Sequence, residues 1–276
     1  MRSLIILFFV LLTVSANSQS NFQGKAVYMS KTTMEMNFGG RQMTEDQKKR
    51  IADRMKGFLE KTFVLNFDQT ESVYKEEEKL SAPGGQGGGR FGGMMSFGAG
   101  LKYKNTKDAI VLEESEFFGK QFLITESGTK PEWVLGAETK KIGNYMCYKA
   151  TLTKEVDPFS IAGFGRGNNN NDAEKKDEKP KTMIVTAWYT PQIPVSQGPG
   201  EYWGLPGLIL EVNAGTTTVL CKEITLNPNE KVTIKKPSKG KKVTRDEYNK
   251  IVKKKTEEMR DQFRGRGGNR GGGRRG

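Results

Sequence analysis

The sequence predicts a mainly β protein, built on a curved antiparallel sheet or half-barrel of about eight to ten strands. Two observations lead to this fold class. Apolar and polar residues alternate over many short segments, which is the period of a half-buried strand. No helix-length periodicity separates most of these segments, so a parallel βαβ architecture is disfavoured and an antiparallel meander is favoured. One helix is expected in the N-terminal half and a basic helix near the C-terminus.

Strands are expected wherever this alternation is clear. They cover residues 24–38, 62–67, 71–80, 109–114, 120–126, 133–138, 145–153, 182–189, 208–213 and 216–226. Asn213 to Gly215 has the composition of a hairpin turn between the last two strands. Residues 82–100 are rich in glycine and residues 159–181 in asparagine and charge, so both are expected to be mobile loops.

Two helices begin with capping boxes, in which a Thr is followed three residues later by Glu or Gln. The first starts at Thr44 and carries an apolar stripe from Ile51 to Leu59, which we expect to pack on the sheet. The second starts at Thr244 and repeats apolar residues from Tyr248 to Phe263. We favour packing of this second stripe on the sheet over the alternative, in which the helix lies on an anionic membrane surface.

The N-terminus has the features of a secretory signal peptide covering residues 1–18. Arg2 precedes an apolar run over 4–14, and Ala16 and Ser18 suit a cleavage site before Gln19. The run is too short for a membrane span, which needs about 20 apolar residues. The mature chain is therefore expected to be exported and to have no transmembrane span.

The charge is concentrated at the C-terminus. Residues 231–276 hold seventeen Lys and Arg against five Asp and Glu, which is +12 of the chain's net +13. We therefore divide the mature chain into a β domain over 19–230 and a segment over 231–276 with a basic helix and a disordered Arg/Gly tail. Removal of that segment is expected to leave the β domain folded. The charge either contacts an anionic lipid, lipopolysaccharide or protein surface, or is simply solvated. The residues proposed for such contact are Lys250, Lys253, Lys254, Lys255, Arg264 and Arg266.

The composition excludes most catalytic chemistry. The chain contains no histidine, so the common metal ligand, the Ser-His-Asp triad and the usual near-neutral general base are all missing. Glu113 and Glu114 are adjacent and should point to opposite faces of a strand, where we expect them to be solvated. No calcium loop is present. We predict no catalytic residue, no metal site and no cofactor, and therefore a protein that is not an enzyme.

The two cysteines, Cys147 and Cys221, both fall in predicted strands. An exported protein can form and keep a disulfide between them. The alternative is a pair of buried free thiols that act as small hydrophobic side chains.

The connection over residues 189–212 is rich in both proline and glycine and carries apolar side chains. Proline fixes φ, so the loop should have a defined conformation. We interpret it as a lid or plug on the sheet, and the alternative is a tight loop that only seals the core. Its central residues are Tyr202, Trp203, Gly204, Leu205, Pro206, Gly207, Leu208 and Ile209.

The hexapeptide from Gly204 to Ile209 resembles the signature of the GLPGLI family of exported Bacteroidetes proteins. Trp133, the run over 141–150 and the segment over 188–199 are similar to the family's central strands and to the approach to the signature. The resemblance covers roughly residues 20–230. It implies a β-rich protein of the cell envelope with no established activity, and it supplies no catalytic residue.

These observations favour a non-enzymatic exported protein of the periplasm or of the periplasmic face of the outer membrane. Its expected role is that of a binding or accessory protein for an outer-membrane partner. The alternative is a periplasmic lipid or lipoprotein carrier, which would need an apolar concave cavity of about 300 Å³ or more. Nucleic acid is not expected as a partner.

Overall fold

The computed structural model describes residues 22–33, 44–77, 100–126, 128–155 and 182–267. The predicted signal peptide and both predicted mobile loops lie outside these residues, apart from Gly100. The elements, in chain order, are β1 (Gln23–Thr32), α2 (Glu45–Leu59), β2 (Glu60–Asp68), β3 (Glu71–Glu76), β4 (Lys102–Asn105), β5 (Ile110–Phe117), β6 (Lys120–Glu126), β7 (Val134–Ile142), β8 (Tyr145–Glu155), β9 (Thr182–Thr190), β10 (Leu208–Ala214), β11 (Thr217–Leu226), β12 (Lys241–Thr244) and α5 (Arg245–Gly267).

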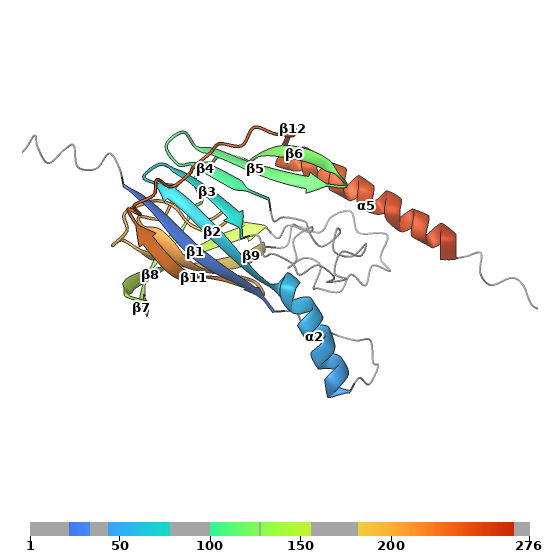
Figure 1. The fold of residues 1–276 in the computed structure, drawn as a ribbon, viewed down its shortest axis with the longest axis horizontal. Helices are drawn as coiled ribbons and strands as arrows, with labels where there is room; N and C mark the ends of the chain where they lie inside the picture. Colours follow the sequence, from blue (N-terminus) through green and yellow to red (C-terminus); the bar gives the residue numbers. More distant parts are fainter. Residues whose placement is uncertain (1–21, 34–43, 78–99, 127, 156–181, 268–276) are drawn as a thin grey trace, which may run out of the picture.

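These strands form one curled sheet in the order β12-β6-β5-β4-β3-β2-β1-β11-β10-β9-β8-β7 (Figure 1). The mainly β class with minor α is confirmed. The described sheet has twelve strands rather than eight to ten, because β4 and β12 are short, lysine-rich segments that alternation did not reveal. All pairs are antiparallel except β12 with β6, which is parallel.

The register separates an inner from an outer face of β1 to β6. Ala26, Leu65 and Tyr74 are paired across β1, β2 and β3 and belong to the main buried core on the inner face. On the opposite, outer face, Val73, Tyr103, Leu112 and Leu123 form a second, smaller cluster across β3 to β6.

The chain after residue 230 wraps around the β6 end of the sheet. Ile234 packs on the outer cluster, β12 extends the sheet, and α5 then covers the inner face with Tyr248 and Val252. The expected boundary at residue 230 therefore does not mark a separate arm in the described residues. The physical reason is that β6 presents apolar side chains on both faces and needs cover on both.

Both capping boxes are confirmed. Thr44 Oγ1 accepts from Gln47 N at 3.3 Å, and Thr244 Oγ1 accepts from Glu247 N at 3.2 Å. Tyr248 and Val252 confirm that α5 packs on the sheet, although the helix runs to Gly267, further than expected.

Helix α2 continues directly into β2 and projects from the end of the sheet (Figure 1). We expected this helix to pack across the sheet, and it does not. The side chains of most of its apolar stripe lie outside those described.

Candidate functional site

The connection between β9 and β10, residues 191–207, fills the inner side of the sheet, and we call it the plug. Ile193 and Val195 are buried in the main core beside Tyr28 and Phe67. Leu205 is buried in a second core cluster with residues of β8, β9 and β10. Of the interpretations open from the sequence, the structure supports a plug.

Hydrogen bonds attach the plug to β10 and to β3. Leu208 N donates to Ile193 O at 2.9 Å, and Ile209 N donates to Gln197 O at 3.0 Å, so the plug runs beside the start of β10. From β3, in the other half of the curled sheet, Ser72 Oγ donates to Gln197 Oε1 at 2.7 Å. The Nε2 of Gln197 is buried and has no hydrogen-bond partner among the described residues.

Aromatic contacts and a glycine fix the second half of the plug. Trp133 Nε1 donates to Trp203 O at 2.8 Å, and the Trp133 ring contacts that of Tyr202. At Gly207 a Cβ atom would lie 2.2 Å from the carbonyl oxygen of Thr190. Any larger residue would clash at this position, so the last glycine of the hexapeptide is required there.

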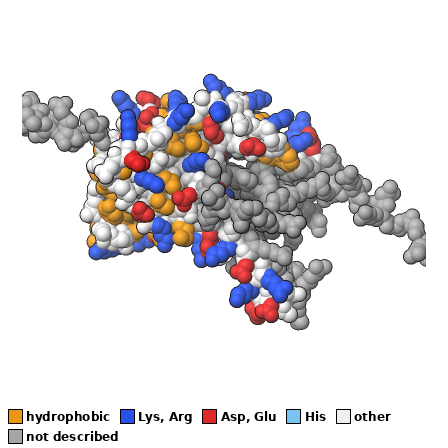
Figure 2. All heavy atoms as spheres, viewed as in Figure 1, with side chains coloured by type: hydrophobic (Ala, Val, Ile, Leu, Met, Phe, Trp, Pro, Cys, Tyr) orange, Lys and Arg blue, Asp and Glu red, His pale blue; other side chains and the backbone are white. Residues whose placement is uncertain are grey.

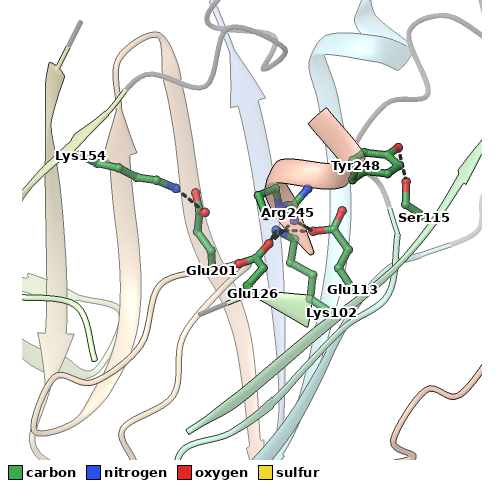
Figure 3. A network of polar contacts seen from close by, with 8 residues as sticks. All are labelled: Lys102, Glu113, Ser115, Glu126, Lys154, Glu201, Arg245 and Tyr248. Atoms are coloured by element: carbon green, nitrogen blue, oxygen red, sulfur yellow. Dashed lines mark hydrogen bonds and ion pairs between the residues drawn. The ribbon is translucent and has the colours of Figure 1, made fainter. Parts of the chain in front are cut away.

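A buried ion network lies next to the plug, where β4, β5 and β6 meet α5 (Figure 3). Lys102 Nζ is 2.9 Å from Glu113 Oε2 and 3.9 Å from Glu126 Oε1. Arg245, the first residue of α5, pairs with both carboxylates and lies 2.5 Å from Glu113. Glu113 is only 2% exposed, so the expectation that it is solvated was wrong. Two cations compensate its burial.

The network holds its members in their charged forms. Burial raises the pKa of Glu113, but Lys102 and Arg245 more than offset this and keep it below its ordinary value. Burial lowers the pKa of Lys102, whereas Glu113 and Glu126 outweigh it and hold the pKa above its ordinary value.

Lys104 lies on the same face of β4 and is 1% exposed. Its Nζ donates to two carbonyl oxygens of the plug, those of Gly198 at 2.5 Å and Tyr202 at 3.3 Å. Burial, followed by the charge of Lys102, lowers the pKa of Lys104 to about 7. Lys104 thus links the plug to the sheet and is not accessible to a substrate.

Glu201 of the plug forms an ion pair with Lys154 of β8 (Figure 3). Burial raises the pKa of Glu201, but Lys102 and Lys154 outweigh that effect and lower it to about 2. The pair connects the plug to β8.

A shallow cleft of about 220 Å³ opens beside this pair. Its lining includes Val111, Glu126, Leu152, Lys154, Glu201 and Trp203. This volume is below the roughly 300 Å³ that a lipid-sized ligand requires.

The carboxylates around the plug are held in ion pairs. Glu113 and Glu201 have lowered pKa values and are paired with cations, so neither is poised as a general acid near neutral pH. In the part of the chain that the structure describes, no three His, Cys, Asp or Glu side chains are placed to hold a metal ion.

Cys147 and Cys221 are free thiols, and both are buried in the main core. The sequence left open a disulfide or a pair of buried free thiols, and the structure has the free thiols. Burial raises the pKa of Cys147 to about 11 and that of Cys221 to about 12, so both are protonated at neutral pH.

The proposed anionic-surface residues of α5 are placed only in part. The side chains of Lys250, Lys253, Lys254 and Lys255 are exposed, and Lys255 pairs with Glu258 at 2.9 Å. Arg264 and Arg266 lie in α5, but their side chains are outside those described. None of the described helices is both long enough and apolar enough to cross a membrane.

Sequence reasoning missed the ion network. Lys102, Lys104, Glu126, Lys154 and Glu201 were not singled out, because charged residues in or beside a strand are normally solvated. A signal was present in β4, where Lys102 and Lys104 flank Tyr103 and share one face of a strand.

Comparisons with known proteins give a family match over part of the chain. No curated protein matches the sequence. Two solved structures of PNGF-II are similar, each with a TM-score of 0.45. The C2 crystal form is 14% identical and covers 84% of this chain and 32% of that chain. The P21 form is 13% identical, and the match covers 83% of this chain and 33% of that chain. This chain thus spans about a third of the PNGF-II chain.

The crystal structure of LprF from Mycobacterium bovis is also similar, with a TM-score of 0.23, 8% identity and coverage of 80% of this chain and 90% of that chain. No functional statement follows from likenesses at this level. The resemblance to the GLPGLI family stays a prediction. Residues 133–211, which include the hexapeptide, match a family model described as a protein of unknown function (Porph_ging).

Proposed function

We propose that this protein is a non-enzymatic, exported envelope protein that binds an outer-membrane partner through the surface of its sheet, and that it resides in the periplasm or on the periplasmic face of the outer membrane. The observation that carries the proposal is the concentration of exposed apolar side chains on β7, β8 and β9. The predicted signal peptide supports export.

The packing of the interior supports this proposal. The plug occupies the inner side of the sheet, with Ile193 and Leu205 buried in separate core clusters. The ionisable groups beside it are paired with opposite charges or bound to backbone carbonyls. The cleft beside Glu201 has a volume of about 220 Å³, less than the roughly 300 Å³ that a lipid-sized ligand requires, so we assign recognition to the surface. The lipid-carrier alternative is disfavoured for the same reason.

The apolar surface is concentrated at one end of the sheet. Of eight large hydrophobic side chains that are exposed among the described residues, five lie on β7, β8 and β9. They are Val134, Leu135, Met146, Tyr148 and Ile184. Val134 and Ile184 are each 68% exposed, and the register places them on the same face of the sheet. Leu135, Met146 and Tyr148 lie on the other face of the same strands. Exposed apolar surface of this kind is typical of sites that bind other proteins.

The experiment compares the double variant Val134→Ser/Ile184→Ser with wild type in the native host. Cross-linking in intact cells, followed by isolation from the envelope fraction, gives the fraction of the protein held in a complex of defined mass. We expect wild type to occupy such a complex and the double variant to lose about 90% or more of it, since two buried apolar anchors contribute about 1.5–3 kcal/mol each.

Leu226→Ser is the matched control, because Leu226 is an exposed leucine on β11, away from the β7 end. This variant should keep the complex. Equal occupancy of the complex by wild type and the double variant would contradict the proposed surface. Turnover of an added envelope component by the purified protein would contradict the non-enzymatic role.

A further inference from the structure

Residues 231–242 form a basic segment on the outer face of the sheet, and we call this segment the strap. It comprises most of the connection from β11 together with the first two residues of β12. It holds six lysines and no acidic residue. All six side chains are exposed, and they are Lys231, Lys235, Lys236, Lys239, Lys241 and Lys242.

The strap lysines have no carboxylate partner among the described residues. Elsewhere on the surface, Lys61 pairs with Glu76 at 2.9 Å, and Lys140 pairs with Glu211 at 2.7 Å. Among the described residues, the one side-chain interaction of a strap lysine is that of Lys236 Nζ, 6.0 Å from the ring centre of Tyr103. The positive charge of the strap is therefore not neutralised by the described part of the protein.

The backbone of the strap is ordered against the sheet. Val232 N donates to Gln23 Oε1 at 3.1 Å, and Asn66 Nδ2 donates to Thr233 O at 3.4 Å. Ile234 packs on the outer cluster, and Pro237 is buried. Gly240 passes so close to β6 that a Cβ atom there would lie 2.8 Å from the backbone of Phe122. The lysines are thus presented from a fixed support, which lowers the entropy cost of binding.

Crossing β2 to β6 on the outer face, the strap forms a line of charge rather than a pocket. Figure 2 shows basic side chains along the margin of the molecule where the segment from β11 to β12 runs in Figure 1. Such a line suits an extended anionic surface better than a single small anion, because no enclosed set of donors converges on one point.

We propose that the strap binds the phosphate headgroups of an anionic lipid surface. Lysine acts there as a point charge, and each lysine near such a surface contributes to binding. All six positively charged side chains are lysines, with no arginine fork for bidentate recognition, which favours a diffuse electrostatic contact. The proposal concerns a different surface from the β7 end and does not depend on the proposed protein partner.

The test measures co-sedimentation of the chain from Gln19 to Gly276 with vesicles of phosphatidylglycerol and phosphatidylcholine in equal parts, at low salt. The variant Lys231→Gln/Lys235→Gln/Lys239→Gln removes three strap charges that form no ion pair, hydrogen bond or ring contact with the described residues. At about fivefold per lysine, we expect its partition coefficient to fall by about 100-fold. Pure phosphatidylcholine vesicles should bind wild type weakly, and added salt should release it from the anionic ones.

The matched control is Lys107→Gln/Lys141→Gln/Lys222→Gln, which removes the same net charge from exposed positions outside the strap. It should lose much less binding than the strap variant. An equal loss in both variants would show that only net charge matters and would overturn the proposal, as would unchanged binding of the strap variant. If the strap lysines are required for binding a single-stranded oligonucleotide but not vesicles, the assignment to lipid is wrong. Equal midpoints of thermal unfolding in all three proteins confirm that folding is unchanged.

Discussion

The buried ion network and the strap both contain positively charged side chains, but they use them in opposite ways. In the network, Lys102 and Arg245 are paired with Glu113 and Glu126 and join three strands to α5. In the strap, a few residues earlier in the chain than Arg245, six exposed lysines have no described carboxylate partner. The positive charges near the C-terminus therefore fall into two groups. One group is structural, and the other is available to a partner.

The C-terminal segment combines both roles. The sequence suggested a removable basic arm, but the segment carries Ile234, Val243, Tyr248 and Val252 into two apolar clusters. Its first helical residue, Arg245, compensates a carboxylate that is almost completely buried. The charge that could bind a surface is thus attached to residues that hold the fold together.

The largest effect is expected from truncation after Glu230. This change removes β12 and α5, exposes apolar residues of β5 and β6, and leaves Glu113 without Arg245. Three lost apolar side chains and one broken buried pair together cost on the order of 8 kcal/mol, similar to the stability of a whole domain. Urea unfolding should show no cooperative transition. Truncation after Gly267 is the control and should keep the wild-type midpoint. A wild-type midpoint in the shorter chain would restore the separate arm.

The substitution Arg245→Met compares the two regions directly. It leaves the buried carboxylate of Glu113 with Lys102 alone, and we expect a loss of about 3–5 kcal/mol in the free energy of unfolding. Lys235→Met also replaces a positive charge with methionine, but in the strap, where the side chain is exposed. That variant should stay within about 0.5 kcal/mol of wild type in urea titrations. Similar losses in both variants would remove the distinction between the regions.

The substitution Lys104→Met tests the link between the network and the plug through pH. The folded pKa of about 7 is below the ordinary value of 10.5, so the unfolded state binds more protons between these values. Wild-type stability should therefore rise with pH from about 7 towards 10, by about 1 kcal/mol per pH unit. Urea titrations over this range should show a clearly smaller rise in Lys104→Met, and parallel curves would contradict the buried position of the amine.

The smallest effect is expected for Glu201→Gln at the edge of the cleft. The folded pKa of Glu201 is about 2, below its ordinary 4.5. Its ion pair with Lys154 therefore stabilises the fold above about pH 4.5, and this stability is lost as pH falls towards 2. Because a third of the side chain is exposed, we expect about 1 kcal/mol. Acid unfolding of the variant should begin from a lower stability and change less over this range, and an unchanged acid profile would count against the pairing with Lys154.

Local patterns predicted much of the fold. Both capping boxes are present, and Gly215 has the positive φ of +60° that suits the turn predicted at Asn213 to Gly215. The longer strands alternate clearly and are found close to their expected positions. These features depend on neighbours in the sequence, so a single chain is enough to reveal them.

The rest depends on contacts between distant residues. The strand β12 has only four residues, three of them polar, and exists because β6 offers a free edge. Glu113 was expected to be solvated because its partner Arg245 is 132 positions away. The choice among lid, plug and seal required the contacts of Ile193, Gln197 and Leu205. No local pattern reports such contacts.

The plug fills the inner side of the sheet, and we propose that the protein acts through its surface. Native mass spectrometry of the mature protein, isolated gently from its own envelope fraction and washed at high salt, tests this most directly. We predict either the mass of the chain from Gln19 alone or that chain in a complex with a protein partner. A lipid retained at one copy per chain after the wash, in wild type and in the strap variant alike, would contradict the claim and favour the carrier role.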